Sequence, residues 1–276
     1  MPKAPKITSK ELGSSRDSNV AGNGFDRVSP LRRQYLEIKE QNPEAIVLFR
    51  LGDFYETFDD DARTAAGVLE ITLTGRDMGK SGRVPMAGVP AHSLEVYLAR
   101  LVKHGYKVAI CEQVSDATTG PGLVDRRVVR IVTPGTVIEP SLLNEKTNNY
   151  IAAIIVKGDE VGLAYADITT AEFTTAQLPL PSLALELERL TPAEILVPQG
   201  LDIDTILGGT RDTSGNFHGP SVTPFEPNLL SSDTARRNLL EHFHVGTLEA
   251  FGCENLPLAT QAAGGLLGYL QDTQKD

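Results

Sequence analysis

The 276-residue chain has no tryptophan and only two cysteines, Cys111 and Cys253. Cysteines this far apart in sequence cannot supply a disulfide framework or a cysteine zinc site, so we expect a reducing, cytoplasmic environment. No apolar run approaches the ~18–20 residues that span a bilayer. The basic residues at the N-terminus are not followed by the apolar segment of a secretory signal. The sequence therefore excludes a helical membrane protein and predicts no membrane partner.

Negative charge is concentrated in the second half of the chain. The formal net charge is −10, from 26 basic and 36 acidic residues. Residues 1–140 hold 19 basic and 18 acidic residues, whereas residues 141–276 hold 7 and 18. A polyanionic partner is therefore expected to contact the first half.

Alternating helical and strand patterns predict an α/β domain after residue 28. Residues 1–28 show no periodicity and predict a disordered arm. Ser29, as an N-cap before Pro30, begins a helix that ends near residue 42. The other elements expected in this domain are, in chain order, strand 45–51, helix 56–69, strand 71–74, a loop over 75–83, helix 93–105, and strands 107–114 and 127–132.

The second half predicts another α/β unit. Three strands joined by short polar turns form an antiparallel meander. These strands and the elements after them are expected at 151–157, 162–168, 172–177, helix 183–190, strand 194–197, a loop over 208–222, helix 232–243 and helix 257–270. No element follows the last helix to cover its apolar positions, so we expect a third domain to begin there.

The glycine-rich segment over residues 75–81 carries a Gly-Lys-Ser sequence that is typical of phosphate-binding loops. Such a loop needs four residues between its glycines and a helix directly after it. Here three residues separate Gly75 from Gly79, and Val84-Pro85 follows in place of a long helix. An ordinary loop is favoured over a nucleotide site. The cations Arg76, Lys80 and Arg83 within it are suited to contacting a phosphate backbone.

Metal chemistry has little support in the sequence. His242 and His244 are two residues apart on an expected helix and point in different directions. They cannot share a metal ion.

Asp167 ends the second meander strand, where a ribonuclease H-like nuclease keeps a metal-binding aspartate. Two-metal catalysis needs at least three converging carboxylates, and the nearest others lie in turns or on another strand. A structural strand-end acid is favoured, with a nuclease using Asp167 as the alternative.

The segment over residues 52–58, Gly-Asp-Phe-Tyr-Glu-Thr-Phe, places two large aromatic residues and a carboxylate after a buried strand. Phe54 and Phe58 are four residues apart, so a helix would bring them together in the core with Tyr55 at its rim. Exposed aromatics beside Glu56 would instead indicate a binding site. The residues alone favour the core interpretation.

Four segments together resemble the N-terminal half of the MutS family of bacterial DNA mismatch-repair proteins. They are RLGDFYETF (50–58), VPMAGVPAHSLEVYLARLVKHGYKVAICEQV (84–114), RRVVRIVTPGT (126–136) and the segment that runs from DTARRNLLEHF to LLGYLQDTQ (233–274). The resemblance implies an α/β fold of two domains, a mixed-sheet mismatch-binding domain over 29–136 and a ribonuclease H-like connector over 145–255. Residues 256–276 would then begin a truncated core or lever domain.

The resemblance also implies site residues. The family's Phe-x-Glu motif falls on Phe54, which would wedge into the mispair from the minor groove, and on Glu56, which would accept a hydrogen bond from the displaced base. Arg76, Met86, Lys80 and Arg83 would hold the DNA beside them. Physically, an apolar wedge unstacks a base step, and a mispaired step is easier to open.

Partners and cofactors follow from the same resemblance. We expect binding of double-stranded DNA with mispairs or small loops, contact with MutL through the connector, and location in the cytoplasm with the nucleoid. The full-length family is a homodimeric ATPase that uses ATP and Mg²⁺. Its clamp and P-loop domains would lie beyond residue 276, so this chain would need no cofactor, have no catalytic residue and could act as a monomer.

Overall fold

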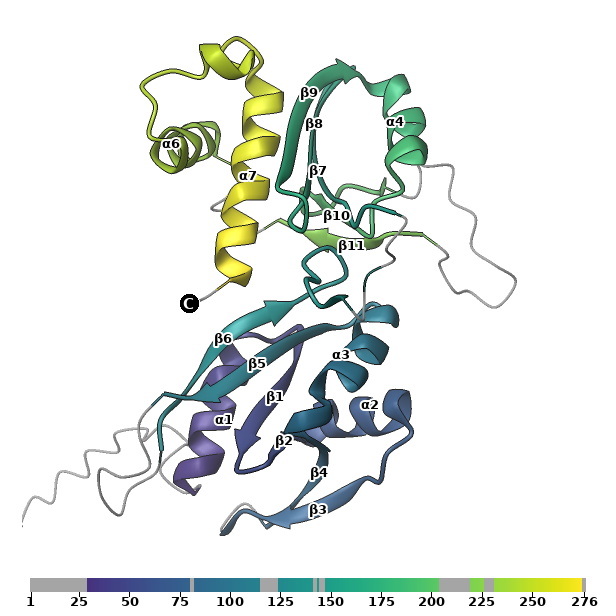
Figure 1. Cartoon of the computed structure of the whole chain (residues 1–276), viewed down its shortest axis with the longest axis vertical. Coiled ribbons are helices and arrows are strands. Elements are labelled where there is room, and N and C mark those ends of the chain that lie inside the picture. The colour runs from purple at the N-terminus through teal and green to yellow at the C-terminus, as the bar shows by residue number, and fades with distance from the viewer. Residues whose placement is uncertain are drawn as a thin grey trace, which may run out of the picture.

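The computed structural model describes residues 29–79, 82–114, 124–140, 143, 147–203, 219–225 and 231–274. Within them the chain forms two α/β units in succession, each built on one mixed sheet (Figure 1). The expected α/β architecture with two sheets is thereby confirmed. Our expectations for residues 1–28, for Lys80 and for residues 208–218 of the expected loop lie outside the described residues.

The first unit holds a six-stranded sheet in the order β3-β4-β2-β1-β5-β6. β1 and β5 are parallel, and the other neighbouring strands are antiparallel. Its elements in chain order are α1 (Pro30–Gln41), β1 (Ala45–Leu51), β2 (Phe54–Phe58), α2 (Asp59–Leu69), β3 (Thr74–Asp77), β4 (Arg83–Pro90), α3 (Leu94–Lys103), β5 (Lys107–Gln113) and β6 (Arg126–Val132).

Helices cover the two faces of the first sheet unequally. α2 and α3 pack on one face, where Leu69 and Leu101 are buried. On the other face Tyr35 of α1 makes edge-on ring contacts with Phe49 and Phe58, at centroid distances of 5.8 and 4.9 Å. α1 contacts β1 and β6, and the start of β2 on this face remains open to solvent.

The second unit holds a five-stranded sheet in the order β11-β10-β7-β8-β9. β7, β8 and β9 form the expected antiparallel meander, and β10 and β11 run parallel to β7, as in a ribonuclease H-like sheet. Its elements are β7 (Ile151–Lys157), β8 (Glu160–Asp167), β9 (Glu172–Pro179), α4 (Leu183–Leu190), β10 (Glu194–Val197), β11 (Ser221–Pro224), α6 (Ser232–Phe243) and α7 (Pro257–Thr273).

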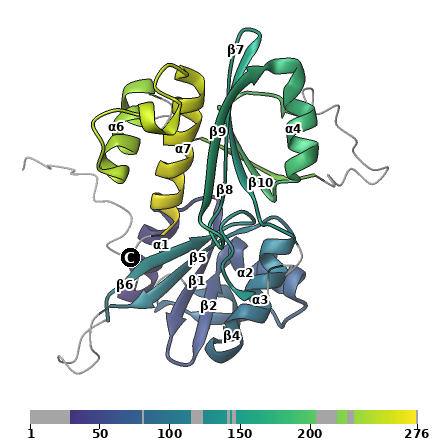
Figure 2. The same cartoon turned by 45° about the horizontal axis from the view of Figure 1, so that its top comes forward.

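α4 lies on one side of the second sheet and α7 on the other, with α6 packed against α7 (Figure 2). The backbones of α7 and β8 approach each other closely: a Cβ at Gly162 in β8 would lie 2.0 Å from the carbonyl oxygen of Leu258 in α7. A Cβ at Gly264 would similarly lie 2.3 Å from that of Ala235 in α6. The apolar positions of α7, which we expected a further domain to cover, thus pack on the second sheet and on α6. The domain limits given above stay predictions.

A buried carboxylate fastens the two units together. Glu194, at the start of β10, is fully buried and accepts four hydrogen bonds. Thr133 Oγ1 (2.5 Å) and the Gly135 amide (3.1 Å) donate from the segment after β6. Thr223 Oγ1 (2.7 Å) and the Tyr269 hydroxyl (2.8 Å) donate from β11 and α7. Burial, and then the negative charge of Glu194, raise the pKa of Tyr269 well above its usual value.

Three expectations about elements in the first unit were wrong. Residues 54–58 form strand β2 and not the start of a helix, and the strand expected at 71–74 begins only at Thr74. The expected loop over 75–83 is strand at both ends, because β3 extends to Asp77 and the eight-residue strand β4 begins at Arg83. In the second unit, β11 lies where a loop was expected.

Candidate nucleic-acid interface

β2 is the strand on which the candidate site is built. It follows β1 through a tight turn at residues 52 and 53, where Gly52 has a positive φ of 60°. Phe49 then lies opposite Glu56, and Leu51 lies opposite Phe54. Successive side chains of a strand point to opposite faces, so Phe54, Glu56 and Phe58 share one face.

The two phenylalanines of β2 have different environments. Phe58 is fully buried beneath α1, whereas Phe54 is 48% exposed at the open end of the same face. Tyr55 points to the other face, where it is 3% exposed and hydrogen bonds to Glu112. The expectation of a helical core pair with Tyr55 at the rim is therefore wrong. Strand alternation turns Tyr55 into the core of the opposite face, and Phe54 lies at the end of its own face that α1 does not cover.

Glu56 is paired with Arg76. Arg76 Nη1 donates to Glu56 Oε2, which joins β3 to β2 across the intervening β4. The Glu56 side chain is 15% exposed and that of Arg76 is 39% exposed. The structure thus brings a carboxylate and a guanidinium together beside the exposed ring of Phe54.

β4 forms the floor of this surface. Met86 lies opposite Phe58 and Thr74 and is half-buried on the same face. Gly88 lies opposite Glu56, where a Cβ would be 3.6 Å from Glu56 Cγ and 4.0 Å from Phe54 Cδ1. Sequence reasoning missed Gly88, although a glycine inside a strand often marks a place of close approach.

The remaining predicted cations do not join this cluster. Arg83 lies opposite Asp77 in the register of β3 and β4, and strand alternation places both on the face opposite Arg76. A Cβ at Gly75 would lie 2.5 Å from Arg83 Nε, so the Arg83 side chain lies across that glycine. Lys80 lies outside the described residues. We name Phe54, Glu56, Arg76, Met86 and Gly88 the β2 surface.

The far end of β2 is held rigidly. The Tyr35 hydroxyl lies 3.3 Å from both the amide nitrogen and the carbonyl oxygen of Phe58 and donates to Asp61 (3.1 Å). Asp61 also accepts from the Val47 amide (3.0 Å) and from Lys39 Nζ (2.8 Å). A side chain on a strand fixed in this way keeps its position when a ligand presses on it.

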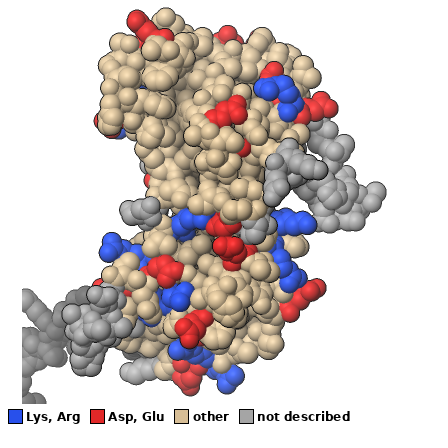
Figure 3. Space-filling view, in the orientation of Figure 1, with Lys and Arg blue, Asp and Glu red and all other residues tan. Residues whose placement is uncertain are grey.

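Basic side chains are more frequent on the unit that carries the β2 surface, where acidic side chains also lie. On the side seen in Figure 3, Lys and Arg lie mainly over the first unit and its border with the second. The second unit shows few of them on this side.

In the part of the chain that the structure describes, no helix is both long and apolar enough to cross a membrane.

The glycine-rich segment does not have the geometry of a nucleotide site. Residues 74–77 and 83–90 are the antiparallel strands β3 and β4, and the Met78 amide donates a hydrogen bond to the Gly82 carbonyl (2.9 Å) beside their ends. Gly79 and Gly82 have positive φ values of 70°. A phosphate-binding loop needs a strand, a loop and then a helix, and this segment therefore does not fit ATP.

Asp167 has a structural environment. It is 1% exposed and accepts hydrogen bonds from the Thr169 amide (2.9 Å), Thr169 Oγ1 (2.6 Å) and the Asn149 amide (3.2 Å). No three His, Cys, Asp or Glu side chains among the described residues are grouped as metal ligands. The nuclease alternative thus has no supporting geometry there.

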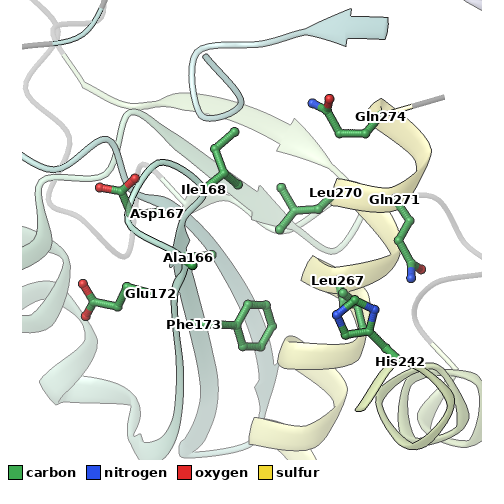
Figure 4. Close-up of a pocket in the computed structure, with 11 residues that line it drawn as sticks. Ala166, Asp167, Ile168, Glu172, Phe173, His242, Leu267, Leu270, Gln271 and Gln274 are labelled. Atoms are coloured by element: carbon green, nitrogen blue, oxygen red, sulfur yellow. The ribbon is translucent and has the colours of Figure 1, made fainter. Parts of the chain in front are cut away.

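A cavity of about 420 Å³ lies beside Asp167, between the β8–β9 turn and α7. Its wall is mainly apolar, with Ile168 and Phe173 facing Leu270 (Figure 4). The carboxylates of Asp167 and Glu172 point away from these side chains. The cavity therefore offers no converging acid groups for hydrolysis.

Comparison with known families matches both units. The model described as MutS domain I matches residues 29–141, and that described as MutS domain II matches residues 149–276. The β2 surface lies within the domain I match. The second match includes α7, which agrees with the packing of that helix on the second sheet.

Curated relatives extend this result. A DNA mismatch repair protein MutS from Dehalococcoides mccartyi (strain 195) is 51% identical over 91% of this chain and 28% of the relative. Those from Symbiobacterium thermophilum and Thermosynechococcus vestitus are 48% and 45% identical over 90% and 96% of the chain. The chain covers 29% and 31% of these two, so it spans about three tenths of the length of its relatives. Two successive domain matches and this level of identity establish that the chain belongs to the MutS family of DNA mismatch-repair proteins.

Proposed function

We propose that the chain recognises mispaired or looped double-stranded DNA through the β2 surface, with Phe54 as the wedge. One observation carries the proposal: a large aromatic side chain is 48% exposed at the open end of a sheet face whose other phenylalanines are buried. A DNA wedge requires an exposed ring, and this one lies on the same strand face as the Glu56 carboxylate.

The physical chemistry of the wedge suits a sensor that must accept many mispairs. Apolar side chains inserted from the minor groove unstack a base step and kink the duplex. A phenyl ring stacks on any base, with a gain of ~1–3 kcal/mol by analogy with single-strand binding. Selectivity then arises because a mispaired step costs less to unstack and bend than a paired one.

Glu56 supplies the second part of the discrimination. Its carboxylate lies on the same strand face as Phe54, two residues further along, and accepts a hydrogen bond from the displaced base. In a matched duplex no base is displaced, and a carboxylate in the groove is repelled by the phosphates. The acid therefore weakens binding to intact DNA more than to mispaired DNA.

The second unit has a different role in this proposal. Its acidic composition disfavours contact with DNA, which suits a connector that meets the protein partner MutL. Homodimerisation and ATP hydrolysis with Mg²⁺ belong, in this proposal, to the longer chains of the family. No described residue is assigned a catalytic role, and the chain acts on DNA of the nucleoid.

The test is the binding of matched and G·T-mispaired duplexes at low salt, by fluorescence anisotropy. Phe54→Ala should abolish the preference for G·T while lowering affinity for matched DNA little. Phe251→Ala is the matched control, because Phe251 is 50% exposed but lies in the second unit. A Phe54→Ala chain that prefers G·T as strongly as the unmodified chain would refute the wedge.

A further inference from the structure

The carboxylate that the proposed function assigns to the displaced base already has a partner. Arg76 and Glu56 are joined by a direct ion pair in the DNA-free chain. A carboxylate oxygen held by a guanidinium is a weaker acceptor for a base. Recognition therefore requires that Arg76 release Glu56, or that it share Glu56 with the base.

The two members of the pair differ in access to solvent. The Glu56 side chain is 15% exposed and lies beside Gly88, which has no side chain of its own to displace it. The Arg76 side chain is 39% exposed and comes from β3, an edge strand of the sheet. The guanidinium is thus the mobile partner, and it can turn toward a phosphate while the acid stays in place.

We propose that Arg76 gates Glu56: the ion pair is closed in the free protein and opens when a phosphate takes Arg76 while a displaced base takes Glu56. This inference rests on the proposed function and adds a specificity-determining role for Arg76. Both charges must find a new partner at the same time for the exchange to be favourable.

Matched and mispaired duplexes differ in what they offer to the pair. A matched duplex supplies phosphates but no displaced base, so opening would leave Glu56 unpaired in a groove of negative potential. An unpaired, partly buried charge is costly, and the pair stays closed. A mispaired duplex supplies both new partners, so Arg76 contacts a phosphate only in that complex.

The competing interpretation is purely structural. The pair ties β3 to β2 across β4, and its removal could simply loosen the edge of the sheet. If the ion pair is only a structural tie, its removal should change the binding of both duplexes equally. Neither duplex breaks the pair when it binds the unmodified chain. The gate predicts an effect on one duplex only, and the salt dependence of binding measures it directly.

The experiment compares slopes of log K against log salt concentration for the full chain on matched and G·T duplexes. The slope is negative, and each phosphate contact makes it steeper by about 0.9 for B-form DNA. Arg76→Gln should make the G·T slope shallower by about 0.9 and leave the matched slope unchanged. Arg76→Lys keeps the charge and should retain the G·T slope, which separates loss of the contact from loss of folding.

Two further variants complete the design. Arg83→Gln is the control, because it removes a positive charge from the same pair of strands but on the face opposite Arg76. It should change the slopes for the two duplexes equally or leave both unchanged. Glu56→Gln frees Arg76, so it should tighten matched binding and make the matched slope steeper by about 0.9. In the Arg76→Gln background the same substitution should leave the matched slope unchanged.

Each outcome has a distinct meaning. Equal slope changes on both duplexes for Arg76→Gln, or additive effects of Glu56→Gln and Arg76→Gln, overturn the gate. If Phe54→Ala still abolishes the G·T preference, the proposed function survives that result. If the unmodified chain binds neither duplex at low salt, the proposed function of this chain fails and the gate fails with it.

Discussion

Separate replacement of Phe58 and Phe54 by alanine tests the strand geometry on which the site depends. Phe58 is fully buried and contacts Tyr35 edge-on at 4.9 Å. Removing a ring from such a position costs ~3–5 kcal/mol of unfolding free energy. Phe54 is 48% exposed. Full burial of a side chain of this size is worth ~1.5–3 kcal/mol, so half-burial predicts a loss of only ~1 kcal/mol.

The assay must report on the first unit alone, because the two sheets have separate cores. Hydrogen exchange followed by mass spectrometry resolves the free energy of opening for peptides that cover β1 and β2. We expect this free energy to fall by ~3–5 kcal/mol in Phe58→Ala and by ~1 kcal/mol in Phe54→Ala. The chain has no tryptophan to report unfolding by fluorescence, so circular dichroism follows the unfolding of the whole chain as a second measurement.

Equal destabilisation by the two substitutions would refute the reasoning, because it would mean that Phe54 is a core residue. A larger loss in Phe54→Ala would do so even more directly. If the expected difference is found, any loss of G·T preference in Phe54→Ala cannot come from unfolding. The stability measurement is therefore the control that gives the binding test its meaning.

Two further predictions concern pH and the joint between the units. Burial, with Glu112 nearby, raises the pKa of Tyr55 and of Cys111 to about 12. The folded state favours their neutral forms, so the free energy of unfolding, measured in urea, should be highest below about pH 9 and fall toward pH 12. An equal free energy of unfolding at pH 8 and pH 11 would contradict this. Glu194→Ala leaves buried donors unpaired at ~1–3 kcal/mol each, so calorimetry should show a loss of several kcal/mol. Glu186→Ala, which breaks an exposed pair with Arg189, is the control and should cost at most ~1 kcal/mol.

Local signals were sufficient for most helices. The side chain of Ser29 caps α1 as expected, by accepting from the Arg32 amide (3.3 Å). Gly105, with a positive φ of 81°, directly follows the His104 C-cap of α3. Caps and helical periodicity depend on neighbours in sequence, so they can be recognised without knowing the fold.

The strands around the site could not be predicted in the same way. Residues 54–58 fit both a helical and a strand period, and pairing with β1 and β4 decides between them. β4 contains Pro85 and Pro90, which argue against a strand in sequence alone. Arg76 and Arg83 are close in sequence, yet strand alternation places them on opposite faces. Only the sheet register shows which of them lies near Glu56.

Three acidic residues on strands show why the partners of a carboxylate, and not its place in sequence, decide its role. Asp167 accepts from backbone amides and a threonine of its own turn, which serves local structure. Glu194 is fully buried and takes its donors from both units, which serves their joint. Glu56 alone of the three is partnered by a guanidinium, that of Arg76, whose side chain is 39% exposed. A backbone donor cannot leave its acceptor without unfolding, whereas an exposed guanidinium can exchange one anion for another. Among these three acids, Glu56 is therefore the one whose partner a nucleic acid can replace.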